Sequence, residues 1–273
     1  LRAPAFRDRV LAGGPALEST FDADALRFAT AAAHETASRI VPEIVLPAAP
    51  PGNEGGFPQG VVLTFPGQGA WDPRLLREVL RFDATARPIL RRANAVSRRI
   101  LGDELLHDGP EADLALSGNP DLGQVASYLT SVLAARYLLT FGIEPCVLLG
   151  HSFGELAALT IGGALDPETG VEIACHRVKA LQDRQDPPGG MLAVLCDEQR
   201  AGELVEAGPS LEVSAVNHSM QTVISGTRED LERLAGVLEK NQIKSVRLGS
   251  RYPFHCELLR EAADSFGGAI RNL

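Results

Sequence analysis

Cysteine is scarce in this sequence of 273 residues, and the few cysteines lie far apart. No Cys-x-x-Cys pair and no group of cysteine and histidine is present; the four are Cys146, Cys175, Cys196 and Cys256. This spacing argues against a disulfide framework and against a zinc site. We therefore expect reduced, mostly buried thiols in a cytoplasmic protein that binds no metal.

A basic excess and a long apolar run are also missing. Lysine and arginine number 26 against 35 acidic residues, so the formal net charge is −9. This balance argues against attraction to nucleic acid or to an anionic membrane. No run approaches the roughly 18 apolar residues of a membrane span, and the start lacks a secretory signal pattern. Because the sequence begins with Leu1, we expect it to be part of a longer chain.

Composition along the chain predicts a division into segments. Proline and glycine crowd residues 41–60, so we expect residues 1–58 to form an N-terminal linker or appendage. Residues 59–188 are predicted to form the first part of a large subdomain, and residues 189–248 a small one. Residues 249–273 are expected to return to the large subdomain.

The predicted fold class is α/β. Short apolar runs at 61–65 and 145–149 are typical of buried strands, and the apolar period of residues 119–141 predicts a helix. We expect an α/β-hydrolase-like large subdomain with a short parallel sheet. Residues 189–248 follow a β-α-β-β-α-β pattern, which predicts an inserted ferredoxin-like small subdomain.

The segment Gly150-His151-Ser152-Phe153-Gly154 joins a predicted strand to a predicted helix. Strand, G-x-S-x-G and helix form the nucleophile-elbow pattern, in which small flanking residues tolerate a tight, strained turn. A serine there lies at a helix N-terminus, where a backbone N–H such as that of Phe153 can stabilise an oxyanion. The alternative is a serine that only caps the helix, which we expect to begin at Ser152.

A nucleophilic serine needs a base, and the sequence has six histidines. His255 follows the last strand of the inserted subdomain, where the returning chain can reach the elbow. His151 adjoins Ser152, so its side chain diverges from the serine and is expected only to line the site. A histidine after a strand can also be purely structural.

Three motifs in this order, TFPGQGAW, GHSFGELAAL and YPFHC, resemble a known family. They are similar to malonyl-CoA:acyl carrier protein transacylases and to the acyltransferase domains of polyketide and fatty acid synthases. The resemblance runs from about Val61 to Cys256. It implies that Ser152 is the nucleophile, that His255 is its base, and that the N–H groups of Gln68 and Phe153 form the oxyanion hole.

The resemblance also implies a ping-pong reaction and its partners. Malonyl-CoA would acylate Ser152, and the phosphopantetheine thiol of an acyl carrier protein would then take the acyl group. No permanently bound cofactor is expected, because the carrier brings the phosphopantetheine. Other domains of a larger synthase are expected partners. The family fold continues well past the 18 residues that follow His255, so we expect a missing C-terminal part.

The resemblance also implies three positions at or near the substrate, two of which are associated with substrate choice. Arg177 matches the arginine that grips the free carboxylate of an extender unit, although an arginine beside an apolar stripe often only extends to solvent. Phe254, before the histidine, points to malonyl rather than methylmalonyl. Asn217 matches a position near the substrate cleft, but a turn asparagine is an equal alternative. The variant GHSFGEL resembles iterative synthases of the polyunsaturated or enediyne kind more than most modular synthases.

Two readings compete with an acyltransferase. An α/β-hydrolase-type esterase or thioesterase would share the elbow, but would need an acid as third triad member and does not explain Arg177. A docking or scaffolding fragment with an inactive site is the non-enzymatic alternative. Methylmalonyl is the alternative acyl group.

Overall fold

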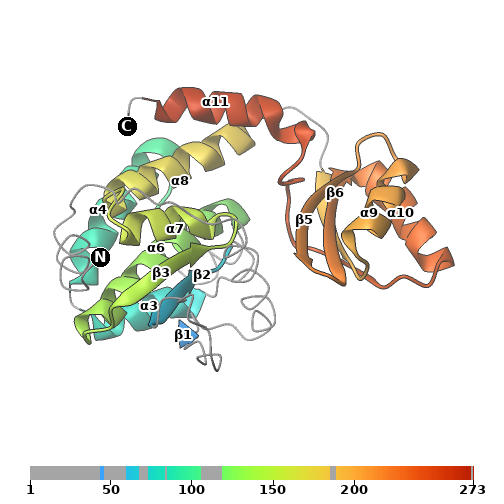
Figure 1. The fold of residues 1–273 in the computed structure, drawn as a ribbon. Helices are drawn as coiled ribbons and strands as arrows, with labels where there is room; N and C mark the ends of the chain where they lie inside the picture. Colours follow the sequence, from blue (N-terminus) through green and yellow to red (C-terminus); the bar gives the residue numbers. More distant parts are fainter. Residues whose placement is uncertain are drawn as a thin grey trace, which may run out of the picture. The chain divides into compact units, whose positions relative to one another are not determined.

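A computed structural model describes residues 44–45, 60–67, 73–83, 85–105, 119–184, 189–271 and 273. These residues form two compact units (Figure 1): the first contains the described residues up to Val178 together with Leu273, and the second contains those from Lys179 to residue 271. The predicted appendage, apart from residues 44–45, lies outside the described residues.

The first unit contains a short sheet in the order β1-β2-β3. Strand β2 (Val61–Phe65) pairs in parallel with β3 (Pro145–Gly150), so that Phe65 lies opposite Gly150. Strand β1 (Ile44–Val45) pairs with β2 in the antiparallel direction. The parallel pair confirms the predicted strands, and both strands end at the same edge, where the candidate nucleophile follows.

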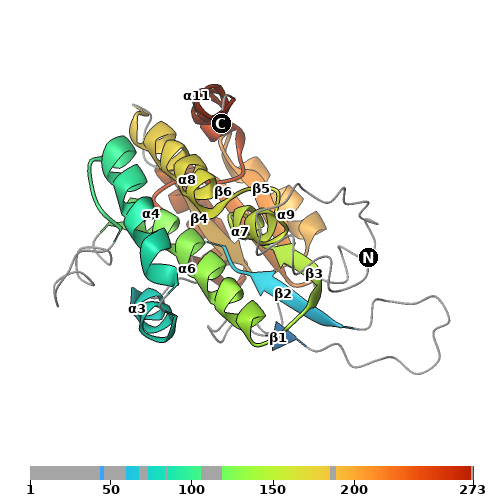
Figure 2. The ribbon, with the colours of Figure 1, turned by 90° about the vertical axis from the view of Figure 1, so that its left-hand side faces the viewer.

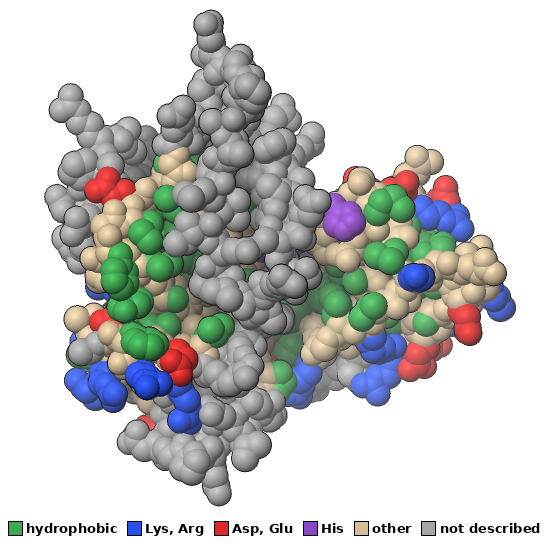
Figure 3. Space-filling view, turned by 90° about the horizontal axis from the view of Figure 1, so that it is seen from below, with side chains coloured by type: hydrophobic (Ala, Val, Ile, Leu, Met, Phe, Trp, Pro, Cys, Tyr) green, Lys and Arg blue, Asp and Glu red, His purple; other side chains and the backbone are tan. Residues whose placement is uncertain are grey.

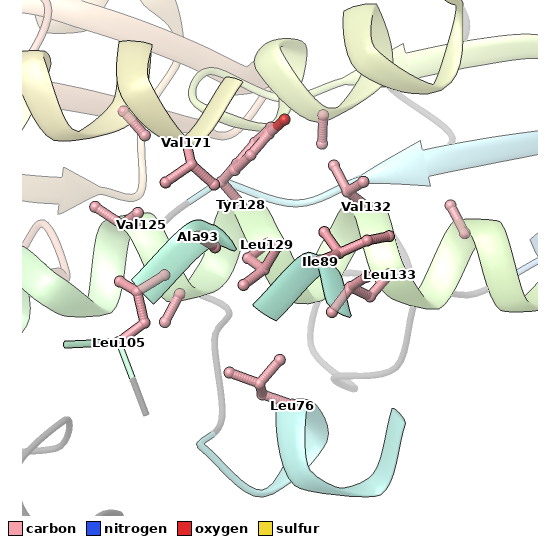
Figure 4. Packing of buried hydrophobic residues seen from close by; sticks show 14 of the residues in the cluster. Leu76, Ile89, Ala93, Leu105, Val125, Tyr128, Leu129, Val132, Leu133 and Val171 are labelled. Carbon is pink, nitrogen blue, oxygen red and sulfur yellow. The ribbon is translucent and has the colours of Figure 1, made fainter. Parts of the chain in front are cut away.

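Helix α6 (Pro120–Thr140) forms the centre of the core of the first unit. Its first turns are buried on nearly all sides, and it packs against α3 (Pro73–Phe82), α4 (Ala86–Leu101) and α7 (Gly154–Ile161) (Figure 2). Side chains from these helices and from α8 (Pro167–Gln182) surround it (Figure 4). The carboxamide oxygen of Asn119 accepts the N–H groups of Asp121 and Leu122 at 3.2 Å, which fixes where α6 begins.

The second unit contains a four-stranded sheet in the order β5-β6-β4-β7, in which all neighbours are antiparallel. Its elements follow in the chain as β4 (Gly189–Val194), α9 (Glu198–Leu204), β5 (Glu212–His218), β6 (Gln221–Thr227), α10 (Arg228–Lys240) and β7 (Ser245–Arg247). This order and pairing confirm the ferredoxin-like prediction. Helices α9 and α10 cover one face of the sheet, and apolar residues of both layers form a core there.

The two units meet in the chain within α8, whereas the predicted boundary was at residue 188. A 3-10 turn (Glu257–Leu259) and α11 (Arg260–Ile270) follow β7 and are grouped with the second unit. The return of residues 249–273 to the large subdomain stays a prediction.

The described surface mixes charges with apolar side chains. Figure 3 shows basic and acidic side chains beside exposed hydrophobic ones on the same face. In the part of the chain that the structure describes, no helix is long and apolar enough to cross a membrane. Within those same residues, no group of three or more histidine, cysteine or acidic side chains could hold a metal ion.

Candidate active site

Ser152 lies in a tight turn between β3 and α7. Its φ is 52°, a left-handed conformation that is uncommon for a residue with a side chain. The N–H of His151 donates to the carbonyl of Phe65 at 2.9 Å, and the N–H of Gly154 donates to the carbonyl of His151 at 2.9 Å. Strand β2 and the turn itself therefore hold Ser152 in a strained position.

The two flanking glycines make this turn possible. A Cβ on Gly150 would lie 2.3 Å from the backbone nitrogen of Glu155, and one on Gly154 would lie 2.1 Å from the carbonyl oxygen of Phe65. Both contacts are with backbone, so a side chain fits at neither position without a backbone shift. The predicted need for small residues at both positions is confirmed.

Helix α7 begins at Gly154, so the prediction that it begins at Ser152 was wrong by two residues. The positive φ of Ser152 is incompatible with a right-handed helix, which explains the later start. Phe153 becomes the N-cap residue. Its N–H therefore lies at the helix N-terminus, where the helix dipole favours negative charge.

The turn after β2 lies against the serine. A Cβ on Gly67 would be 3.2 Å from Nδ1 of His151 and 3.8 Å from Cβ of Ser152. Gln68, the predicted second oxyanion donor, lies outside the described residues. Its role stays a prediction, and its neighbour Gly67 is in contact distance of the nucleophile turn.

Arg177 contacts the nucleophile turn through Phe153. Its guanidinium carbon lies 4.8 Å from the centroid of the Phe153 ring. Its Nη1 donates a hydrogen bond to Oε1 of Gln124, a residue of α6 that is 4% exposed. The arginine thus ends in a partly buried cluster beside Ser152, rather than extending only toward solvent. Gln124 was not predicted from the sequence; an amide within a predicted apolar helix signals a polar contact, but it does not show which residue is the partner.

His255 lies in a turn of the second unit and also has a positive φ, of 59°. The hydroxyl of Ser225 donates to the carbonyl of Phe254 at 2.7 Å, and the hydroxyl of Ser214 donates to Ser225 at 2.6 Å. On the other side, the N–H of Glu257 donates to the carboxylate of Glu212 at 2.9 Å. Side chains from β5 and β6 therefore hold the peptide before His255 and the peptide between Cys256 and Glu257.

Three further predicted residues have clear surroundings. The side chain of His151 is exposed. Phe254 is 6% exposed and packs in an apolar cluster with Met191 and Val223, so its ring is a core element of the second unit. Asn217 lies in β5 rather than in a turn, and its Nδ2 donates to Oε1 of Gln221 at 2.8 Å. The substrate roles of these three residues stay predictions.

The first unit thus brings Ser152, His151, Phe153 and Arg177 together, and the second unit carries His255, Phe254 and Asn217. The sequence model of the family described as the acyl transferase domain matches residues 62–271, which is most of the chain. The chain belongs to the acyl transferase domain family. The chain resembles family members that are parts of synthases, and it resembles family members whose structures have been solved.

Two polyketide synthases illustrate the sequence likeness. This acyl transferase domain is 31% identical over 218 residues to the spectinabilin polyketide synthase system protein NorC of Streptomyces orinoci, covering 79% of this chain. It is 30% identical over 210 residues to the erythronolide synthase EryA3 of Saccharopolyspora erythraea, covering 76% of this chain. The chain spans 10% and 6% of the length of these two proteins. It is similar to one segment of large multidomain enzymes.

Two solved structures illustrate the structural likeness. The malonyl CoA-acyl carrier protein transacylase from Clostridium perfringens is 26% identical with a TM-score of 0.66, over 78% of this chain and 67% of that one. The acyltransferase domain of an iterative polyketide synthase in enediyne biosynthesis is 34% identical with a TM-score of 0.52, over 56% of this chain and 41% of that one. The mixed α/β fold of the acyl transferase domain is therefore shared with a malonyl CoA-acyl carrier protein transacylase and with the acyltransferase domain of a polyketide synthase.

Proposed function

We propose that this acyl transferase domain loads malonyl from malonyl-CoA onto the phosphopantetheine thiol of an acyl carrier protein, as part of a larger synthase. The observation that carries the proposal is the cation beside the nucleophile turn, since the guanidinium of Arg177 stacks on the ring next to Ser152. A hydrolase acting on an uncharged acyl group has no use for a cation there. An enzyme that selects a carboxylated acyl group needs one, because a carboxylate without a partner is costly to desolvate.

In the first half-reaction, His255 takes the proton of the Ser152 hydroxyl as the serine oxygen bonds to the thioester carbon. The resulting oxyanion accepts hydrogen bonds from the N–H groups of Phe153 and Gln68. The carbon–sulfur bond then breaks and His255 returns the proton to sulfur. CoA leaves, and malonyl remains as an ester on Ser152.

In the second half-reaction, the thiol of the carrier gives its proton to His255 and its sulfur attacks the ester carbon. The bond to the serine oxygen breaks, and that oxygen recovers the proton from His255. The phosphopantetheine belongs to the carrier, so the domain itself needs no bound cofactor. Arg177 holds the free carboxylate throughout, and Phe254 favours malonyl over methylmalonyl.

Intact-mass measurement after incubation with a panel of acyl-CoAs tests this function. We expect one malonyl group on the wild-type protein and none on Ser152→Ala. Turnover of malonyl-CoA to free malonate without a carrier, and without a stable adduct, would favour the esterase alternative. Equal labelling of both proteins would remove Ser152 from the chemistry, and preferred loading of methylmalonyl would correct the acyl group.

Arg177→Ala tests the carboxylate contact. A hydrogen bond to a charged group contributes about 1.5–3 kcal/mol, so malonyl loading is expected to fall roughly 10- to 100-fold. Acetyl loading, measured in parallel, should change little. Equal losses for both acyl groups would contradict a role in binding the carboxylate.

A further inference from the structure

Three side chains from three elements meet at the guanidinium of Arg177. Arg177 comes from α8, Gln124 from α6, and Phe153 from the turn that opens α7. The amide oxygen of Gln124 accepts a hydrogen bond from Nη1 of Arg177, and the guanidinium carbon lies over the ring of Phe153, 4.8 Å from its centroid. The cation is therefore held by one hydrogen bond and by one aromatic ring.

These two contacts matter because arginine is flexible. A free arginine side chain carries about 2 kcal/mol of rotamer entropy, which is lost each time it orders around a carboxylate. A guanidinium that is already ordered loses less on binding. Gln124 is suited to this work because it is 4% exposed, so its amide oxygen needs an internal partner and stays in place.

Phe153 adds a second constraint, because it directly follows Ser152 in the chain. Its backbone is part of the strained turn, and its side chain packs against the core of the first unit. The position of the ring is therefore set by the same turn that sets the position of the nucleophile. A cation on that ring is held at a defined distance from the serine oxygen.

We propose that Phe153 and Gln124 are positioning residues that fix the guanidinium of Arg177 relative to Ser152, and so set the preference for a carboxylated acyl group. This inference rests on the proposed malonyl transfer. It gives Phe153 a second role: its N–H faces the oxyanion, while its ring orders the cation. The ring then contributes to selectivity without touching the acyl group.

Phe153→Leu tests the ring and Phe153→Tyr is its matched control. Leucine keeps the bulk and the backbone N–H but has no aromatic face, whereas tyrosine keeps the face. A cation–π contact contributes about 0.5–2 kcal/mol, so Phe153→Leu should lower kcat/KM for malonyl-CoA roughly 2- to 30-fold, mainly through KM. The ratio of malonyl to acetyl loading should fall by the same factor in Phe153→Leu, whereas Phe153→Tyr should retain the wild-type ratio, whatever either variant does to the absolute rate.

Gln124→Met tests the second contact, because methionine has a similar length and no strong acceptor. Like Phe153→Leu, Gln124→Met should lower the ratio of malonyl to acetyl loading. A ratio that stays at the wild-type value in both Phe153→Leu and Gln124→Met would overturn the inference. Equal losses for both acyl groups would overturn it too, because they would show a purely structural role.

A nuclear magnetic resonance measurement separates this inference from the proposed function. The side-chain Nε–H proton of Arg177, assigned by its loss in Arg177→Ala, should show a ring-current shift in the wild type and in Phe153→Tyr but not in Phe153→Leu. If that pattern holds while the wild type loads no malonyl, the malonyl function fails and the positioning stands. If the chemical shift of this proton is the same in Phe153→Leu as in the wild type, the ring of Phe153 does not position Arg177, whichever acyl group the domain transfers.

Discussion

The turn that carries Ser152 and the turn that carries His255 hold their residues in similar backbone conformations by different means. Among the non-glycine residues that the structure describes, only Ser152, Gln242 and His255 have positive φ values. At the serine, the flanking residues Gly150 and Gly154 have no Cβ, so the backbone packs closely and enforces the conformation. At the histidine, two hydrogen bonds do so: the hydroxyl of Ser225 donates to the carbonyl of Phe254, and the carboxylate of Glu212 accepts the N–H of Glu257.

This difference predicts different responses to mutation. Backbone packing cannot adjust to one added atom, so the serine turn should tolerate almost no change at its glycines. A turn held by side-chain hydrogen bonds loses one bond at a time, so the histidine turn should weaken in steps. The turns that carry the two residues of the proposed catalytic pair are thus expected to differ in their tolerance of mutation.

Gly154→Ala should give the largest effect. Its Cβ would lie 2.1 Å from the carbonyl oxygen of Phe65, which also accepts the N–H of His151 and so cannot move freely. We expect a cost at the upper end of overpacking, about 3 kcal/mol, together with loss of malonyl labelling. Chemical denaturation and intact-mass labelling would measure both.

Gly236→Ala is the matched control for that variant. Gly236 lies in α10, is exposed, and has no atom within 4 Å of the added Cβ. The exchange should stabilise the protein by up to about 1 kcal/mol, because alanine favours the helix. If Gly154→Ala behaved like Gly236→Ala, the rigid description of the serine turn would be wrong.

Ser225→Ala should give an intermediate effect on the histidine turn. Ser225 is fully buried and donates to the carbonyl of Phe254, so its loss should cost about 1–3 kcal/mol of stability. With the peptide before His255 released, acyl transfer should slow roughly 10-fold, which corresponds to about 1.4 kcal/mol in the barrier. The ratio of malonyl to acetyl loading should stay unchanged, since Arg177 is not affected.

Ser214→Ala provides the comparison for Ser225→Ala. It removes the outer hydrogen bond at 2.6 Å but leaves Ser225 bonded to Phe254. Steady-state rates of both variants should therefore differ, with Ser214→Ala nearer the wild type. Identical rates would mean that the hydrogen bond to Phe254 does not position His255.

The sequence allowed prediction of the structural features that depend on residues adjacent in the chain. The strand, the G-x-S-x-G turn and the following helix are contiguous, and the β-α-β-β-α-β order of the second unit shows in local periodicity. The start of α7 was missed by two residues because a positive φ at a serine depends on packing against Phe65. Propensity carries no information about that packing.

The supporting residues were missed for the same reason. Gln124 is 53 residues from Arg177, and Ser225 is 29 residues from Phe254. These pairs form only when separate elements pack, so no spacing in the sequence reveals them. The role of Arg177 was predicted only through family resemblance, because an arginine beside an apolar stripe often just extends to solvent.

Cys256 should contribute the least to the histidine turn. Its Sγ donates to the carbonyl of Pro253 at 2.9 Å, and burial raises the pKa of this thiol above its ordinary value. A raised pKa favours the neutral thiol, so the S–H donor persists through neutral pH and is lost only as the pH rises further. A thiol is a weak donor, so Cys256→Ala should change acyl transfer by no more than roughly 2-fold.

Alkylation of the wild type at mildly alkaline pH, followed by peptide mass mapping, should be slower at Cys256 than at a free cysteine peptide. If Cys256→Ala slowed transfer as much as Ser225→Ala, the thiol rather than the serine would hold this turn, and the comparison with the glycine-built serine turn would have to be drawn anew.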